Sequence, residues 1–135
     1  MKPVPENILA SGPEETQWYG GAVDRSKMSL RIECEPSELD AVSELLGCVS
    51  DNPNRWIIAA PESEGAKLDD QVASILGRLA TDLEIWRQVS SKYRVDIFCG
   101  LFLERPNRGV SISPDTMTQL GARGIEFGFD IYAPD

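Results

Sequence analysis

Three stretches of the chain alternate apolar and polar residues with the two-residue period of a β-strand that buries one face. They lie at residues 28–34, 95–104 and 125–132, and a short apolar run at 56–60, ended by Pro61, predicts a fourth strand. We expect the inward positions of the three alternating stretches to be Met28, Leu30, Ile32, Cys34, Val95, Ile97, Cys99, Leu101, Leu103, Ile125, Phe127, Phe129 and Ile131.

Apolar residues at helical spacing predict three helices. The first covers residues 38–46 and stops at Gly47, and the longest runs as one continuous helix over residues 68–90. The third is short, with Ser113 as its N-cap, and ends at Gly124. The expected inward residues are Leu39, Val42, Leu45 and Leu46 in the first, Leu68, Val72, Ile75, Leu76, Leu79, Leu83, Trp86 and Val89 in the second, and Met117 and Leu120 in the third.

A turn over residues 105–109, followed by Val110 and Ile112 as a short returning strand, predicts a hairpin after the strand at 95–104. The elements then read β-α followed by β-α-β-β-α-β, the second part having ferredoxin-like connectivity. We therefore predict an α+β fold with a ferredoxin-like split β-α-β sheet. Its helices would lie on one face, and an extra β-α unit and an irregular N-terminal arm would precede it.

Residues 1–26 are rich in proline, glycine and glutamate, a composition that interrupts regular elements. We assign them to the arm and residues 27–135 to a single α+β domain. Trp18 and Tyr19 are adjacent large aromatics that need a surface to pack on. We expect them to dock on the domain's own core, with a hook for a partner protein as the alternative.

The composition is that of a globular protein with a strong excess of acid. The chain of 135 residues has 13 Lys and Arg against 22 Asp and Glu, for a net charge of -9, which would repel nucleic acid and anionic lipid. No apolar stretch reaches the roughly 20 residues that cross a bilayer, and no signal peptide is evident. Three cysteines without C-x-x-C spacing fit a reducing compartment. We expect a cytoplasmic protein without nucleic-acid or membrane partners.

The chain contains no histidine. Serine and cysteine triads, histidine metal sites and the usual proton shuttle near neutral pH are therefore excluded. Glycine-rich phosphate loops are also absent, so we assign no catalytic residue, no metal and no cofactor. We expect Cys34 and Cys99 to be buried, inert thiols and Cys48 to be the reactive one in a loop.

The outward residues of the three alternating strands are the candidate binding surface. If these strands share a sheet, its face away from the helices would be acidic with three aromatics, and Arg31 would be the acids' one obvious basic neighbour. The candidate binding residues are Asp96, Phe98, Phe102, Glu104, Glu126, Asp130 and Tyr132, with Arg31 and Glu33 beside them.

Several motifs together resemble a bacterial family known only as the domain of unknown function 4279. They are the run Val95-Asp96-Ile97-Phe98-Cys99-Gly100-Leu101-Phe102-Leu103, then Ser111-Ile112-Ser113-Pro114 and Asp130-Ile131-Tyr132, with Leu30-Arg31-Ile32, Leu45-Leu46-Gly47 and Trp56 upstream. The resemblance covers about residues 27–133. It implies one small α+β domain and supplies no activity, cofactor or binding site.

We expect a non-catalytic protein-binding module, most specifically an immunity or inhibitor protein that neutralises a basic bacterial toxin. Small size, acidity and the lack of catalytic motifs favour this hypothesis. One alternative is a carboxylate-based or magnesium-dependent enzyme using Asp96, Glu126 and Asp130. Another is a homodimeric structural protein. The arm or a dimer partner could also cover the aromatics of the sheet face.

Overall fold

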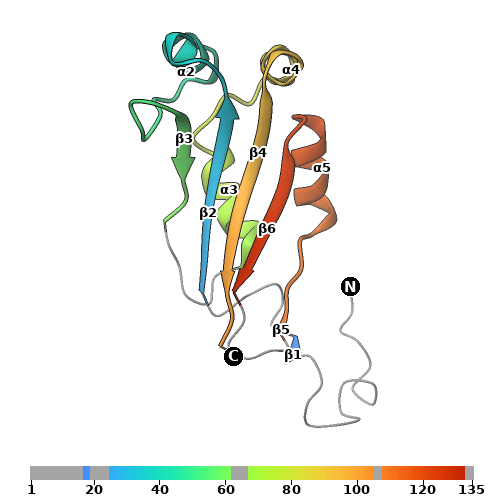
Figure 1. Ribbon diagram of the computed structural model, residues 1–135. Helices are drawn as coiled ribbons and strands as arrows, with labels where there is room; N and C mark the ends of the chain where they lie inside the picture. Colours follow the sequence, from blue (N-terminus) through green and yellow to red (C-terminus); the bar gives the residue numbers. More distant parts are fainter. Residues whose placement is uncertain (1–16, 19–24, 62–66, 105–107, 133–135) are drawn as a thin grey trace.

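A four-stranded sheet forms the centre of the protein in the computed structural model, which describes residues 17–18, 25–61, 67–104 and 108–132 (Figure 1). The strand order is β3-β2-β4-β6. β3 and β4 are antiparallel to β2, whereas β6 is parallel to β4. The strands are β2 (Arg25–Glu33), β3 (Trp56–Ala59), β4 (Arg94–Phe102) and β6 (Glu126–Tyr132).

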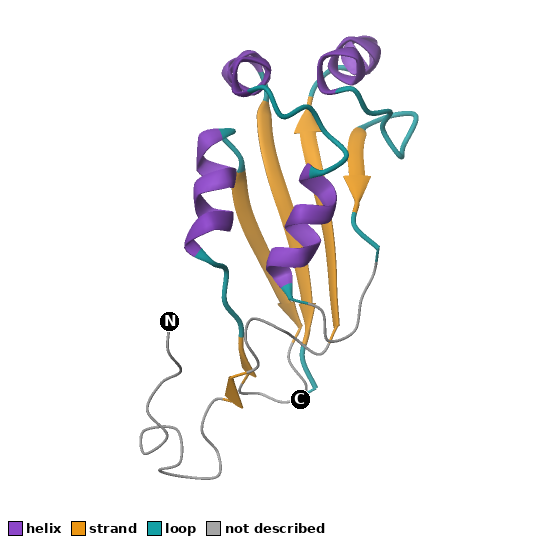
Figure 2. Cartoon of the chain, turned by 180° about the vertical axis from the view of Figure 1, so that it is seen from behind, coloured by secondary structure: helices purple, strands orange, loops and turns teal. Residues whose placement is uncertain are grey.

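Helices pack against this sheet, which confirms the α+β class. Figure 2 shows α3 and α5 against one face, with α2 and α4 across the end where β2 stops and β4 begins. The helical segments are η1 (Pro36–Glu38), α2 (Leu39–Leu46), α3 (Leu68–Leu76), α4 (Leu83–Lys92) and α5 (Pro114–Ala122). None of the helices in the described residues is long and apolar enough to cross a membrane.

The core lies between the sheet and the helices, and the alternation in β2 and β4 contributes Met28, Leu30, Ile32, Val95, Ile97, Cys99 and Leu101 to it. Leu30 of β2 and Ile97 of β4 are paired in register and fully buried. Two tryptophans fill the end beneath α2 and α4, and each has a partner for its indole N–H. Trp86 donates to Ala80 O (2.7 Å) and Trp56 donates to Ser43 Oγ (3.0 Å). These bonds remove the desolvation cost that a buried unpaired N–H would carry.

The single helix expected over residues 68–90 is wrong, because the chain turns between α3 and α4. α3 ends before Gly77, and Asp82 caps α4 by accepting a hydrogen bond from the backbone N–H of Glu84. Leu79 in the turn is buried like its neighbours in both helices. The apolar stripe therefore continues through the turn, and periodicity alone could not reveal the break.

The expected hairpin at residues 105–112 is also wrong. β5 (Arg108–Gly109) pairs in parallel with β1 (Gln17–Trp18), and the strand beside β4 is β6. Val110 and Ile112 pack on the core as an unpaired segment leading into α5. The ferredoxin-like arrangement is therefore not confirmed. The expected turn at 105–107 lies outside the described residues.

The first strand of the sheet also begins earlier than the expected residue 28. β2 begins at Arg25, and Trp18 lies in the paired strand β1. Tyr19 lies outside the described residues. The docking of the Trp18 and Tyr19 side chains stays a prediction.

The third helix begins as expected, but one of its faces was assigned wrongly. Ser113 accepts the capping hydrogen bond from the Thr116 N–H (3.1 Å). Leu120 is buried, whereas Met117 is 56% exposed and Thr116 takes the inward place. The inward positions are thus spaced by four residues, the spacing of one helix face.

Gly124 provides a sharp test of the turn between α5 and β6. Its φ is +70°, and a Cβ placed there would lie 2.8 Å from Ser90 Cβ and Oγ. We predict that Gly124→Ala lowers the free energy of unfolding by about 2 kcal/mol, from backbone strain and this clash. Urea denaturation measures the change. The matched control is Gly121→Ala in α5, where a Cβ meets nothing within 4 Å. It should leave stability unchanged or raise it by up to about 1 kcal/mol. Equal effects of both substitutions would contradict the prediction.

Candidate functional site

The face of the sheet away from the helices is the candidate site, and β2, β4 and β6 form it together as expected. The register places Asp96 beside Arg31 on one side and beside Glu126 on the other. Phe102 lies between Arg25 and Tyr132 in the same way. We call this surface the open face and define it by Lys27, Ser29, Arg31 and Glu33 of β2, Arg94, Asp96, Phe98, Gly100 and Phe102 of β4, Glu126, Gly128, Asp130 and Tyr132 of β6, and Arg25 at the start of β2.

Arg31 and Asp96 form the best-defined ion pair on the open face. The guanidinium donates two hydrogen bonds to the carboxylate, from Nε (3.0 Å) and from Nη2 (2.7 Å). The same guanidinium lies 5.0 Å from the centre of the Phe98 ring. Hydrogen bonding to Asp96 raises the pKa of Arg31 above its ordinary value, although partial burial opposes this. The pair holds both side chains flat against the sheet.

Arg94 gives the acids a second basic neighbour, contrary to expectation. It donates to Glu126 Oε1 (2.9 Å) and lies 3.7 Å from Glu33, and the contact with Glu126 raises its pKa. The open face therefore combines Arg25, Lys27, Arg31 and Arg94 with Glu33, Asp96, Glu126 and Asp130. Its charges are balanced. The sequence interpretation found an acidic face because it began these strands at Met28 and Val95, so that Arg25, Lys27 and Arg94 were left out.

A stacked pair of aromatic rings lies at the other end of the open face. The rings of Phe102 and Tyr132 are 4.7 Å apart and almost parallel, with an interplanar angle of 5°. The guanidinium of Arg25 lies 4.2 Å from the Phe102 centroid. Gly100 lies beneath the rings, where a Cβ would be 3.5 Å from Phe102. The absence of a side chain there leaves the rings room to lie across the sheet.

The Tyr132 hydroxyl donates a hydrogen bond to Asp130 on the same strand. This bond raises the pKa of the phenol, and Tyr132 is 48% exposed. Asp130 is the acid of the open face for which the described residues provide no basic partner. Glu104 is exposed and follows the end of β4, so it lies beyond the paired rows. Six of the seven candidate binding residues are thus brought together.

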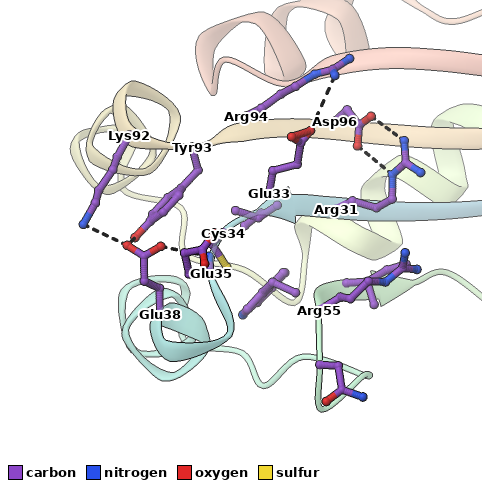
Figure 3. A pocket seen from close by; sticks show the side chains of 14 residues that line it. Arg31, Glu33, Cys34, Glu35, Glu38, Arg55, Lys92, Tyr93, Arg94 and Asp96 are labelled. Atoms are coloured by element: carbon purple, nitrogen blue, oxygen red, sulfur yellow. Dashed lines mark hydrogen bonds and ion pairs between the residues drawn. The ribbon is translucent and has the colours of Figure 1, made fainter.

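A cleft of about 730 Å³ continues the open face past the ends of β2 and β3 (Figure 3). Glu38 accepts hydrogen bonds from the Glu35 N–H (3.0 Å) and the Tyr93 hydroxyl (2.7 Å), and Lys92 lies 3.3 Å away. These contacts hold the pKa of Glu38 below its usual value, and the hydrogen bond from the Glu35 backbone N–H contributes most. The hydrogen bond from the Tyr93 hydroxyl to Glu38 raises the pKa of Tyr93. Sequence reasoning missed this cleft because its groups come from five separate elements, β2, η1, β3, α4 and β4.

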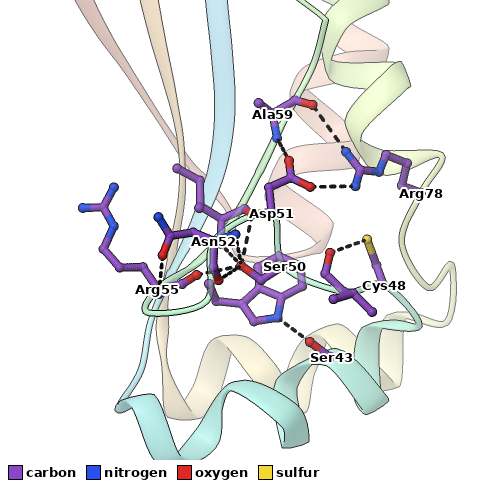
Figure 4. A network of polar contacts seen from close by, with 11 residues as sticks. Ser43, Cys48, Ser50, Asp51, Asn52, Arg55, Ala59 and Arg78 are labelled. Atoms are coloured by element: carbon purple, nitrogen blue, oxygen red, sulfur yellow. Dashed lines mark hydrogen bonds and ion pairs between the residues drawn. The ribbon is translucent and has the colours of Figure 1, made fainter.

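The loop between α2 and β3 is fixed by its own polar side chains (Figure 4). Ser50 Oγ accepts from the Ile57 N–H (3.0 Å), and Asp51 accepts from the Ala59 N–H (3.0 Å). Arg78 donates to both Asp51 (3.3 Å) and the Ala59 carbonyl (3.4 Å). These residues therefore stabilise the outer edge of β3.

The geometry gives little support to acid-base chemistry by Asp96, Glu126 and Asp130. The carboxylates of the first two are already engaged in ion pairs with Arg31 and Arg94. Across the described part of the chain, no three His, Cys, Asp or Glu side chains gather closely enough to hold a metal ion. The arrangement is suited to contact with another molecule through planar side chains and fixed charges.

A family model described as a domain of unknown function (DUF4279) matches residues 34–134. The match includes β3, β4, α5 and β6 and starts just after β2. No curated protein and no solved structure matches the chain.

The ion pairs of the open face make a stability prediction. Asp96 is only 16% exposed and binds Arg31 through two hydrogen bonds, so Asp96→Asn should cost about 1 kcal/mol of unfolding free energy. The exposed Asp130 has no basic partner among the described residues, and Asp130→Asn should change stability by less than about 0.5 kcal/mol. Urea titrations of the two variants measure this difference. Equal midpoints would show that the Arg31 contact contributes nothing in solution.

The three thiols should react in a defined order. Burial raises the pKa of Cys99 to about 11, so almost none of it is thiolate near pH 8. Cys34 is only partly buried, contrary to expectation, and burial together with Glu38 and Glu35 raises its pKa. We predict that a maleimide labels Cys48 first, Cys34 more slowly and Cys99 only after unfolding, as read by peptide mass spectrometry. Labelling of Cys99 at the rate of Cys48 in the folded protein would contradict its burial.

Proposed function

The chain belongs to the DUF4279 family, whose description names no activity, and we propose from its geometry that it is a non-catalytic protein-binding module acting through the open face of its sheet. The observation that carries this proposal is the pair of stacked rings of Phe102 and Tyr132 beside Arg25. Tyrosine and arginine are enriched among residues that dominate binding energies at protein interfaces.

The side chains of the open face are held before any partner arrives. Phe98 lies beneath Arg31, and Arg31 is fixed by Asp96. Phe102 is fixed between Tyr132 and Arg25. A surface that is already ordered loses little conformational entropy on binding, which favours affinity.

The charge of the whole chain supports a basic partner. The open face is balanced, so the excess that gives the net charge of -9 lies outside it. A charge of this size attracts a positively charged protein over a distance of about 10 Å at 0.1 M salt. The open face would then supply the short-range contacts. Association would depend on salt, whereas dissociation would depend on the aromatic pair.

An immunity or inhibitor protein is the most specific form of this proposal. Such a protein needs a rigid surface and a charge opposite to that of its target, and it needs no catalytic group. The partner would be a basic toxin or another basic enzyme, met in the cytoplasm. Expression of a candidate toxin with and without this chain tests that form directly, because the chain should restore growth.

The role of the open face is tested by capturing partners on the immobilised protein and measuring their binding by surface plasmon resonance. We predict that Phe102→Ala increases the dissociation rate about tenfold or more, whereas Asp130→Asn, which removes an acid from the contact surface itself, slows association more than the same change in charge elsewhere. The matched control is Asp115→Asn at the start of α5, which makes the same charge change on the helical side. Wild-type kinetics for Phe102→Ala and Asp130→Asn would move recognition away from the open face.

A further inference from the structure

β6 is an edge strand whose outer side is not paired with any described segment. The Leu103 N–H donates to the Tyr132 carbonyl (2.9 Å), which fixes the direction in which the backbone groups of β6 point. In a parallel pair, alternate residues of a strand bond to the same neighbour. Tyr132 and the even-numbered residues therefore bond to β4. The backbone N–H and C=O groups of Phe127, Phe129 and Ile131 point to the outer side.

The side chains of these outward residues are also incompletely covered. Phe127 is half-buried, Phe129 is 44% exposed and Ile131 is 58% exposed. Exposure thus increases from Phe127 to Ile131, and all three of these residues are apolar. An uncapped strand edge with apolar side chains is a site where another strand can pair.

The opposite edge of the same sheet is built differently. In β3 the outward residues are Ile57 and Ala59, and all their backbone groups have partners. Ser50 and Asp51 bond to Ile57, and Asp51 and Arg78 bond to Ala59 (Figure 4). One edge is thus capped by polar side chains, whereas the described residues leave the other edge open.

The sequence of β6 is complementary to itself when two copies run antiparallel. A two-fold axis perpendicular to the sheet places residues of the same face opposite each other. An axis at Gly128 would place Glu126 against the other copy's Asp130, and an axis at Asp130 would place two Asp130 side chains together. Both arrangements oppose like charges directly, which is destabilising.

An axis at Phe129 avoids both conflicts. Phe129 then faces its own copy, Phe127 faces Ile131, Gly128 faces Asp130 and Glu126 faces Tyr132. Apolar residues meet apolar ones on the helical side, and no two acids are opposite on the open face. The outward N–H and C=O groups of Phe127, Phe129 and Ile131 are the ones that bond across this axis.

We propose that the chain forms a two-fold homodimer by antiparallel pairing of β6 with β6 about Phe129, so that two four-stranded sheets become one continuous sheet. The occupant of the open edge is a second copy of this chain. Because both copies carry a net charge of -9, added salt should tighten the dimer by screening their repulsion. Binding of a basic partner has the opposite salt dependence.

The mass in solution tests the dimer, measured on the full chain by size-exclusion chromatography with light scattering. The wild type should approach twice its 14.9 kDa as concentration rises. Phe129→Asp and Phe129→Lys each place like charges opposite themselves, so each should raise the dissociation constant about 100-fold or more. An equal mixture of the two variants should restore the dimer, because Asp then faces Lys.

The control is Val49→Asp, which introduces a charge at a residue that is 78% exposed in the capped loop before β3. This variant should dimerise like the wild type. A wild type that stays monomeric, a mixture that stays monomeric, or a control that loses the dimer would each overturn the proposal.

Hydrogen exchange of the backbone amides in the wild-type protein is a second test, and it does not depend on whether the Phe129 variants fold. The amides of Phe127, Phe129 and Ile131 should be protected at high concentration and exchange on dilution. Protection that does not change on dilution would mean that another part of the same chain covers the edge, and would overturn the proposal. Rapid exchange at every concentration would overturn it as well.

Discussion

The antiparallel register between β2 and β4 determines which side chains enter the core and which lie on the open face. Nine pairs, from Arg25 with Phe102 to Glu33 with Arg94, fix which residues face the helices and which face away. A shift of β2 by one residue would move Leu30 out of the core and bring Arg31 into it, while Asp96 of β4 stayed on the other face. The cost of burying a charge away from its partner and of exposing apolar residues is what holds the register.

The same register also assembles the open face from short local contacts. Arg31 reaches Asp96 because they are direct cross-strand neighbours, and Phe102 reaches Tyr132 for the same reason on the other side of β4. Each contact joins residues that are distant in sequence. A binding surface of this kind requires no catalytic motif, which fits a chain without histidine and a family whose description names no activity.

The sequence was sufficient where one physical signal decided the outcome. Alternation identified the sheet strands and the face of Asp96, Phe98 and Phe102, and Ser113 with Pro114 marked the start of α5. Prediction from the sequence failed where two different structures share one pattern of apolar residues. The stripe from Leu68 to Val89 fits one helix or two packed on the same core.

Prediction from the sequence also misplaced the ends of strands, because a charged residue at the end of a strand cannot be told from a loop residue by its pattern. Arg25, Lys27 and Arg94 were omitted for this reason, and the open face seemed acidic when it is balanced. The sequence pattern did not reveal the exposure of Phe129 and Ile131 either. Their alternation is that of buried residues, and only the position of β6 at the edge leaves them uncovered.

The polar cap on β3 determines how far strand pairing can extend. If both edges of the sheet were open, β6 of one copy could add to β3 of the next, and the sheets would continue without end as in a fibre. Ser50, Asp51 and Arg78 already occupy the groups that such an addition would need. Growth through the proposed β6 pairing would therefore close after two copies. A seven-residue strand with three outward apolar residues could then pair with its own copy without starting an open-ended stack of sheets.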